Sequence, residues 1–229
     1  MTGHHPTIIP YDTNTTVLAA AKLLLNASDA DPSLQNVPEF KYDIVDVTRQ
    51  VLANRFIDLY INLLVVFNSS TSSSDVSAAG ASLVSLIDDL DELLYTDENF
   101  LLSTWIEDAR QWAEEGCRVN KSYAAYLEYT ARNQLTLWGP NGEINDYASK
   151  QWAGLVGEYY SKRWNMFVQH LVHLKENGGV YNDSVIAKQI LQFSQKWQSP
   201  AQGQMGRALG RNTKGNTFEI VRAVLKTWG

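Results

Sequence analysis

Carboxylates are the side chains in this sequence best suited to acid–base chemistry, and many of the 25 Asp and Glu residues occur as adjacent pairs. Two carboxylates about 5 to 9 Å apart carry out glycoside hydrolysis, one as general acid and the other as nucleophile or base. Neighbours on a helix point about 100° apart, so adjacent carboxylates do not face one another. We therefore expect solvated polar faces for these pairs, which are Asp88 and Asp89, Asp91 and Glu92, Glu107 and Asp108, and Glu114 and Glu115.

A different pair, Glu143 and Asp146, lies between aromatic residues in the stretch NQLTLWGPNGEINDYASKQWAGL. The run Gly139-Pro140-Asn141-Gly142 interrupts the helical pattern there and predicts a rigid turn. Trp138 ends a helix directly before this run, so we expect its ring to be exposed, with Tyr147 beside it. Such an aromatic platform is a natural surface for the apolar face of a sugar ring. Asp146 is placed where the next helix needs an N-cap, which favours a structural role for its carboxylate.

Other candidate sites are weaker. His170 and His173 are three residues apart and Glu176 follows, but zinc sites need three or four firm ligands and no further cluster supports one, so we predict no metal. The glycine-rich stretch 203–215 lacks the Gly-Lys-Ser/Thr of a phosphate loop and is expected to be a surface loop. Cys117, the one cysteine, lies in no nucleophile motif and allows no internal disulfide. We predict no cofactor.

The candidate residues lie on or between helices that the periodicity of the sequence predicts. Apolar residues recur at steps of three and four with no alternating strand pattern, so the predicted fold class is all-α: a bundle-like domain of about eight helices, no β-sheet, covering residues 1–229 as one domain. The Ser-rich segment 68–74 is expected to connect two antiparallel helices at the surface. Gly178-Gly179 is expected to end a long helix. The predicted helices cover 13–26, 41–67, 75–95, 98–115, 121–137, 145–176, 183–198 and 215–228.

Seven Trp and eleven Tyr are heavy aromatic use, and much of it is expected in the core. Five large aromatics lie on the apolar stripes and are predicted core residues: Trp105, Trp112, Tyr159, Trp164 and Phe167.

Composition excludes some functions and indicates a compartment. A net charge of -6 with scattered Lys and Arg argues against a nucleic-acid partner. No run of 18 uncharged apolar residues occurs, so we predict no membrane span. Five Asn-x-Ser/Thr sequons lie in predicted loops or helix ends and favour a secreted or lysosomal glycoprotein whose signal peptide lies outside this chain. The sequon asparagines are Asn14, Asn26, Asn68, Asn120 and Asn182.

Four segments, 42–60, 86–110, 129–164 and 215–229, together resemble the C-terminal helical domain of the α-N-acetylglucosaminidases, the family 89 glycoside hydrolases, which include the lysosomal enzyme of heparan sulfate breakdown. The segment YTARNQLTLWGPNGEINDYASKQWAGLVGEYYSKRW is long and specific. The resemblance covers nearly the whole chain from about residue 13 and is less tight beyond residue 180.

This resemblance implies an exo-acting, retaining enzyme with a small N-terminal domain, a central (β/α)₈ barrel and this helical domain last. Both catalytic glutamates of the family lie in the barrel, so no catalytic residue is expected in this chain. By position in the motif, Trp138, Ile144 and Tyr147 resemble residues that form one wall of the pocket for a terminal N-acetylglucosamine. The family's helical domain starts upstream of Met1, so its first helices are expected to be missing, and an exposed barrel-facing surface would favour a homo-oligomer.

Two hypotheses about the function of the chain follow, from different classes of protein. In the first, the chain is the accessory domain of a glycosidase and is inactive alone. In the second, it is an independent helical module that binds sugar or protein through the surface around Trp138 and Tyr147. A third, an α/α-barrel lyase or inverting glycosidase with its own carboxylates, needs more helices than the sequence contains.

Overall fold

The computed structural model describes residues 13–113, 121–199 and 212–229, and within them the fold is all-α, as predicted. A π-helical turn, η3 (Val156–Tyr160), runs directly into α6, and short 3₁₀ turns are η1 (Pro32–Asn36) and η2 (Glu98–Phe100). The α-helices are α1 (Thr13–Ala30), α2 (Pro38–Ser69), α3 (Ser73–Leu94), α4 (Leu102–Gln111), α5 (Lys121–Leu135), α6 (Ser161–Asn177), α7 (Asp183–Trp197) and α8 (Thr217–Trp228).

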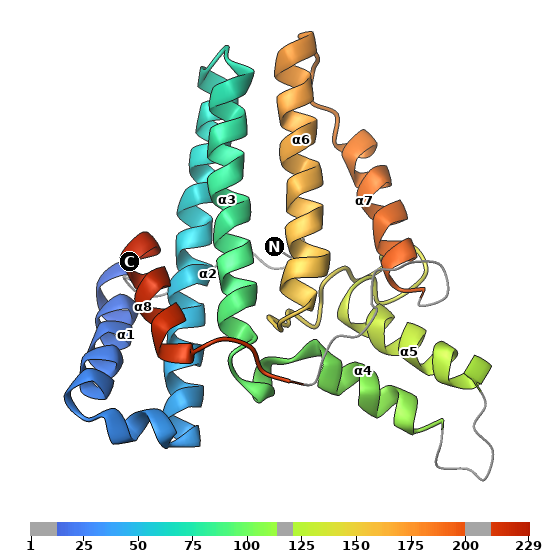
Figure 1. The fold of residues 1–229 in the computed structure, drawn as a ribbon. Coiled ribbons are helices and arrows are strands. Elements are labelled where there is room, and N and C mark those ends of the chain that lie inside the picture. Colours follow the sequence, from blue (N-terminus) through green and yellow to red (C-terminus); the bar gives the residue numbers. More distant parts are fainter. Residues whose placement is uncertain (1–12, 114–120, 200–211) are drawn as a thin grey trace.

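Three long helices, α2, α3 and α6, form the centre of the molecule (Figure 1). Helices α2 and α3 are antiparallel and joined at residues 70–72, which confirms the surface connection predicted from the Ser-rich segment. Helix α6 packs on α3 and carries α7 beside it, whereas α1 and α8 pack on α2. Helices α4 and α5 form a separate pair at the base of the bundle.

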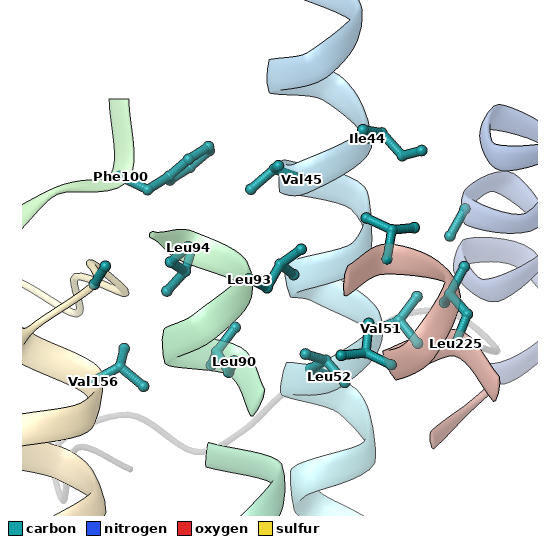
Figure 2. Packing of buried hydrophobic residues seen from close by; sticks show 14 of the residues in the cluster. Ile44, Val45, Val51, Leu52, Leu90, Leu93, Leu94, Phe100, Val156 and Leu225 are labelled. Carbon is teal, nitrogen blue, oxygen red and sulfur yellow. The ribbon is translucent and has the colours of Figure 1, made fainter. Parts of the chain in front are cut away.

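The largest core lies where α2, α3 and α8 meet (Figure 2). Leu52 on α2 and Leu93 on α3 are fully buried, and Leu225 on α8 packs into the same cluster. Burying one such side chain stabilises the fold by roughly 2 kcal/mol. Phe100 and Val156 extend the cluster towards the loop that precedes α6, so the core reaches the segment that contains the candidate site.

A second core lies under the α4–α5 pair and contains Tyr159 and Trp197, both almost completely buried. This core joins α5 to α7 and to the π-helical turn η3. Helix α5 leads into the turn at residues 139–142. Most of the predicted core aromatics are at least partly buried, but Trp112 is 62% exposed and that prediction was wrong. Helix α4 ends at Gln111, so Trp112 follows the last turn and has left the buried stripe.

The long helix predicted from residue 145 begins later. Ala153 makes two backbone hydrogen bonds where η2 leads into α4: its carbonyl accepts from Leu102 at 3.1 Å and its N–H donates to the Phe100 carbonyl at 2.7 Å. Gly154 follows with φ 87°, a conformation that glycine adopts without steric cost, and the helical path starts after it. The far end agrees with the prediction, because α6 stops at Gly178 in a left-handed C-cap.

Helix α2 passes the length and composition test for a membrane span, with 22% of its most apolar window buried. A core helix passes the same test, and α2 lines two of the three clusters of buried apolar residues. The expectation of no membrane partner therefore stays a prediction.

Candidate functional site

The sequence-predicted site residues Trp138, Ile144 and Tyr147 lie together on one turn, residues 136–149, which we call the Trp138 turn. Their exposed fractions are 41%, 37% and 55%. The rings of Trp138 and Tyr147 are 5.7 Å apart and meet edge to face at 67°. The structure thus brings the two aromatics together at the surface, as expected from the sequence.

The backbone of the Trp138 turn is unusually constrained. Three residues other than glycine have left-handed φ values there: Trp138 at 48°, Asp146 at 56° and Ser149 at 48°. Each such residue costs of order 1–2 kcal/mol and persists only where the surroundings enforce it. Gly139 and Gly142 also have positive φ. Strained backbone of this kind clusters at functional sites, so its concentration here supports a functional role.

Asn133, in the last turn of α5, holds the start of this turn. Its Oδ1 accepts a hydrogen bond from the Gly139 N–H and its Nδ2 donates to the Gly139 carbonyl, both at 2.9 Å. Its backbone carbonyl accepts from the Trp138 N–H at 2.8 Å. One residue therefore fixes both peptide groups around Trp138.

Helix α7 supports the turn from the other side. Gln195 donates to the Pro140 carbonyl at 2.9 Å. Gln198, which is buried, accepts from Asn133 Nδ2 at 3.2 Å and donates to Thr136 Oγ1 at 2.8 Å. The two glutamines are three residues apart, so both can reach the same side of the helix end.

Asp146 does not cap a helix, so the N-cap prediction was wrong. The carboxylate is buried and accepts two hydrogen bonds of 2.8 Å from Arg163 Nη1, and the Asp146 N–H donates to the Thr136 carbonyl at 2.7 Å. The Arg163 guanidinium also lies 4.8 Å from the centre of the Tyr159 ring. Because α6 starts well beyond Asp146, this carboxylate joins the turn to the helix through a side chain instead of capping it.

Glu143 is exposed on the same turn and folds back onto the backbone. Its Oε2 accepts from the Asn141 N–H at 3.1 Å, and a Cβ at Gly139 would overlap its carboxylate. Hydrogen bonds from its own backbone N–H and from Asn141 lower the pKa of Glu143. A general acid needs a raised pKa, so Glu143 is poorly suited to that role.

Asp91 on α3 is the described carboxylate whose pKa is shifted furthest from its ordinary value. Its Oδ1 accepts from the N–H groups of Gly154 and Gly157, both at 2.8 Å. Burial raises the pKa of Asp91 to about 6 in spite of these bonds, and burial also raises the pKa of nearby Glu158. The solvated position expected for Asp91 was therefore wrong, because the loop before α6 folds over it.

Two other carboxylates of the adjacent pairs also make tertiary contacts. Asp88 accepts from Ser161 Oγ at 2.6 Å, and Asp89 accepts from Trp228 Nε1 at 2.7 Å. Glu92 and Asp108 are exposed, as expected, and the pair at 114–115 lies outside the described residues.

The two histidines do not converge. The His170 ring packs 5.9 Å from the Tyr181 ring, and His173 interacts with Asn177 one turn later. Within the described ranges no group of three His, Cys, Asp or Glu residues is arranged to hold a metal ion. Cys117 and most of the glycine-rich stretch 203–215 lie outside the described residues.

The sequons differ in their surroundings. The side chains of Asn26, Asn68 and Asn182 are exposed, and Asn182 also caps α7 by accepting from the Ser184 N–H at 3.0 Å. Asn120 lies outside the described residues, and so does the side chain of Asn14. Glycosylation at these sites stays a prediction.

Sequence reasoning missed the residues that hold the Trp138 turn. Asn133 and Gln198 are 65 positions apart, and nothing in a helical pattern indicates that they meet. Arg163 could have been suspected, since it is a cation next to the predicted core residue Trp164, but its partner Asp146 could not have been named.

The chain matches the family model described as Alpha-N-acetylglucosaminidase (NAGLU) C-terminal domain over residues 2–227. Alpha-N-acetylglucosaminidase from Homo sapiens is 38% identical over 179 residues, which cover 78% of this chain and 23% of that protein.

The fold is similar to solved structures of a family 89 glycoside hydrolase from Clostridium perfringens. The complex with PUGNAc has a TM-score of 0.83 at 21% identity and covers 100% of this chain and 25% of that one. The complex with 2-acetamido-1,2-dideoxynojirmycin has a TM-score of 0.79 at 23% identity, with 98% and 25% covered. A third, with its substrate GlcNAc-alpha-1,4-galactose, has a TM-score of 0.79 at 22% identity, with 97% and 24% covered. The chain thus spans about a quarter of these relatives' length.

Proposed function

The chain belongs to the family of α-N-acetylglucosaminidase C-terminal domains, and from that premise we propose that it is the accessory helical domain of a larger retaining exo-α-N-acetylglucosaminidase. Its partner would be the catalytic (β/α)₈ barrel of the same enzyme. Its role would be to form one wall of the pocket for a terminal α-linked N-acetylglucosamine, as in heparan-sulfate-type glycans. The chemistry would be done by glutamates of the barrel.

One observation carries this proposal: the exposed, rigidly held pair Trp138 and Tyr147. Aromatic rings offer a flat apolar surface to the C–H face of a sugar, and a ring fixed before the sugar arrives loses little entropy on binding. Ile144, on the same turn, would add apolar contact. A solved relative was obtained with its substrate GlcNAc-alpha-1,4-galactose, a glycan with this terminal sugar.

The carboxylates on the Trp138 turn favour an accessory role over an independent catalytic one. Asp146 is committed to Arg163, and the pKa of Glu143 is lowered by backbone N–H groups. A glycosidase needs one carboxyl group that is protonated at working pH and a second that is free to attack or to activate water. This turn supplies neither.

The test is the substitution Trp138→Ala in the full-length enzyme of which this chain would be the last part. We expect kcat/KM for 4-nitrophenyl N-acetyl-α-glucosaminide to fall about tenfold or more, with an unchanged melting temperature, because an aromatic contact to the sugar is lost. Trp112→Ala is the matched control, since Trp112 is also an exposed Trp but lies at the end of α4. Equal kinetics for the two variants would contradict the proposal.

An independent sugar- or protein-binding module is the second candidate, because the Trp138 pair is exposed in the chain taken alone. The two candidates differ in one observable. A free-standing module binds N-acetylglucosamine-terminated glycans without a barrel, whereas a pocket wall holds the sugar only when the opposite wall is present.

We also propose a secreted or lysosomal location and glycosylation at the sequons. Exposure of Asn26, Asn68 and Asn182 supports this. Ile61 and Val65 on α2 are 53% and 56% exposed, which for the chain in isolation favours self-association into a homo-oligomer.

A further inference from the structure

We infer that Asn133 is a positioning residue for Trp138, and that Gln198, the residue that follows α7, sets the orientation of the Asn133 amide. This inference rests on the proposed function, since it assigns what holds the proposed sugar-binding ring in place. Asn133 itself would not need to touch the sugar, so its effect on turnover would pass through Trp138.

Asn133 acts as a clamp on the backbone around Trp138. Asn133 makes three hydrogen bonds to two consecutive residues: its carbonyl binds the Trp138 N–H, and its amide oxygen and nitrogen bind the N–H and carbonyl of Gly139. The peptide groups on both sides of the Trp138 Cα are thereby fixed. The direction in which the indole leaves the backbone is fixed with them.

This clamp holds a backbone conformation that the chain would otherwise leave. Trp138 has φ 48°, which an L-residue with a large side chain seldom adopts. Without the two side-chain bonds to Gly139, we expect the backbone to relax towards negative φ and the indole to turn away from Tyr147. Asn133 therefore controls where the ring points.

The Asn133 amide has one orientation. Asn133 Nδ2 donates to Gln198 Oε1 at 3.2 Å, and Gln198 Nε2 donates to Thr136 Oγ1 at 2.8 Å. Thr136 Oγ1 in turn donates to the Arg132 carbonyl at 2.8 Å. Gln198 and Thr136 are buried, so a reversed amide would leave buried polar groups unpaired, at a cost of about 1–3 kcal/mol each.

The test uses Asn133→Asp in the full-length enzyme. The introduced carboxylate can still accept from Gly139 N–H, but it cannot donate to the Gly139 carbonyl or to Gln198, and it repels both oxygens. Gln134→Glu is the matched control, because it makes the same amide-to-acid change at the next residue, which is exposed. We expect Asn133→Asp to lower kcat/KM about five- to fiftyfold through misplacement of the ring, and Gln134→Glu to leave it unchanged.

A double-mutant cycle separates positioning from general stability. In the Trp138→Ala background, Asn133→Asp is expected to lower kcat/KM by less than about twofold, since the ring it positions is gone. If Asn133→Asp lowers kcat/KM by the same factor with and without Trp138, the inference is overturned while the proposed function stays intact. No effect of Trp138→Ala alone would overturn the proposed function, and with it the role of Asn133 in turnover.

A second variant and a second readout cover the case in which the charged variant fails to fold. Asn133→Ser removes the two side-chain bonds of the clamp to Gly139 without adding charge, and the same non-additivity with Trp138→Ala is expected. In the 229-residue chain, Asn133→Ser should accelerate hydrogen exchange at the amides of Trp138 and Gly139, whereas Gln134→Ser should not. Unchanged exchange at both amides would contradict the clamp itself, whatever the kinetics show.

Discussion

Arg163 donates two hydrogen bonds of 2.8 Å to the two carboxylate oxygens of Asp146 and so joins the Trp138 turn to the first helical turn of α6. Both side chains are largely buried, and Asp146 is held in a left-handed backbone conformation. A contact between residues 17 positions apart thus fixes the end of the turn that carries Tyr147, while Asn133 fixes the end that carries Trp138.

Removing this ion pair should be costly. We expect Asp146→Ala to lower the free energy of unfolding by about 3 kcal/mol, because it leaves the buried Arg163 charge uncompensated. The control is Asp58→Ala, which breaks an exposed pair with Arg55 and should cost less than about 1 kcal/mol. Urea denaturation of the 229-residue chain measures the free energy of unfolding of both variants. Equally small losses of stability would show that the buried ion pair does not stabilise the fold.

Asp91 should make stability depend on pH. Its pKa is raised by burial from 3.8 to about 6 in the folded chain, so its stabilising contribution is complete below pH 3.8 and is lost as the pH rises through about 6. The difference of about two pKa units corresponds to roughly 3 kcal/mol.

The substitution Asp91→Asn keeps an oxygen acceptor for Gly154 and Gly157 and removes the titration. Relative to the original chain, we expect it to gain stability between pH 4 and pH 7.5 by about that amount. Urea midpoints across this pH range give the answer, with Glu92→Gln as the control on the exposed side of α3. If the difference in stability between the original chain and Asp91→Asn is the same at every pH, the pKa assigned to Asp91 is wrong.

Gly139 should not tolerate a side chain. Its φ of 146° is unfavourable for L-residues, and a Cβ would overlap the Glu143 carboxylate. We expect Gly139→Ala to cost about 1–3 kcal/mol of folding free energy. It should cost more than Gly178→Ala, where φ is 65° but the space is open. Adding Glu143→Ala should recover part of the loss, and no recovery would mean that the overlap is not the cause.

The exposed sequons should carry glycan when the chain is made in a secreting eukaryotic host. Endoglycosidase treatment should lower the mass, and Asn26→Gln, Asn68→Gln and Asn182→Gln should each remove one increment. A mass that treatment leaves unchanged would count against the secreted or lysosomal location.

Much of the fold could be predicted because it depends on local pattern. The apolar steps of three and four predicted most helix ends to within about four residues, but α6 begins at Ser161 and not at residue 145. The Ser-rich segment and Gly178 correctly marked the ends of helices. Apart from the exposed Trp112, the main failures lie between residues 136 and 160. There the path is set by contacts between distant segments, such as Ala153 with Phe100 and Asp91 with Gly157, which helical periodicity does not encode.

The candidate site was predictable in part for the same reason. The turn and the exposure of Trp138 followed from Gly139-Pro140 and from the place of Trp138 at the end of a predicted helix. The role of Asp146 did not, because capping is a local rule and its partner Arg163 lies on another element. The Asn133–Gln198 contact joins α5 to the end of α7, and only the folded chain brings these two amides together.

We propose that this chain shapes a sugar pocket whose catalytic carboxylates lie elsewhere. The most direct test of this proposal is hydrolysis of 4-nitrophenyl N-acetyl-α-glucosaminide by the purified 229-residue chain, measured beside the full-length enzyme. We expect no hydrolysis by the chain alone and turnover by the full-length enzyme. Hydrolysis that stays with the chain through purification and is abolished by Glu143→Gln or Asp146→Asn would contradict the proposal.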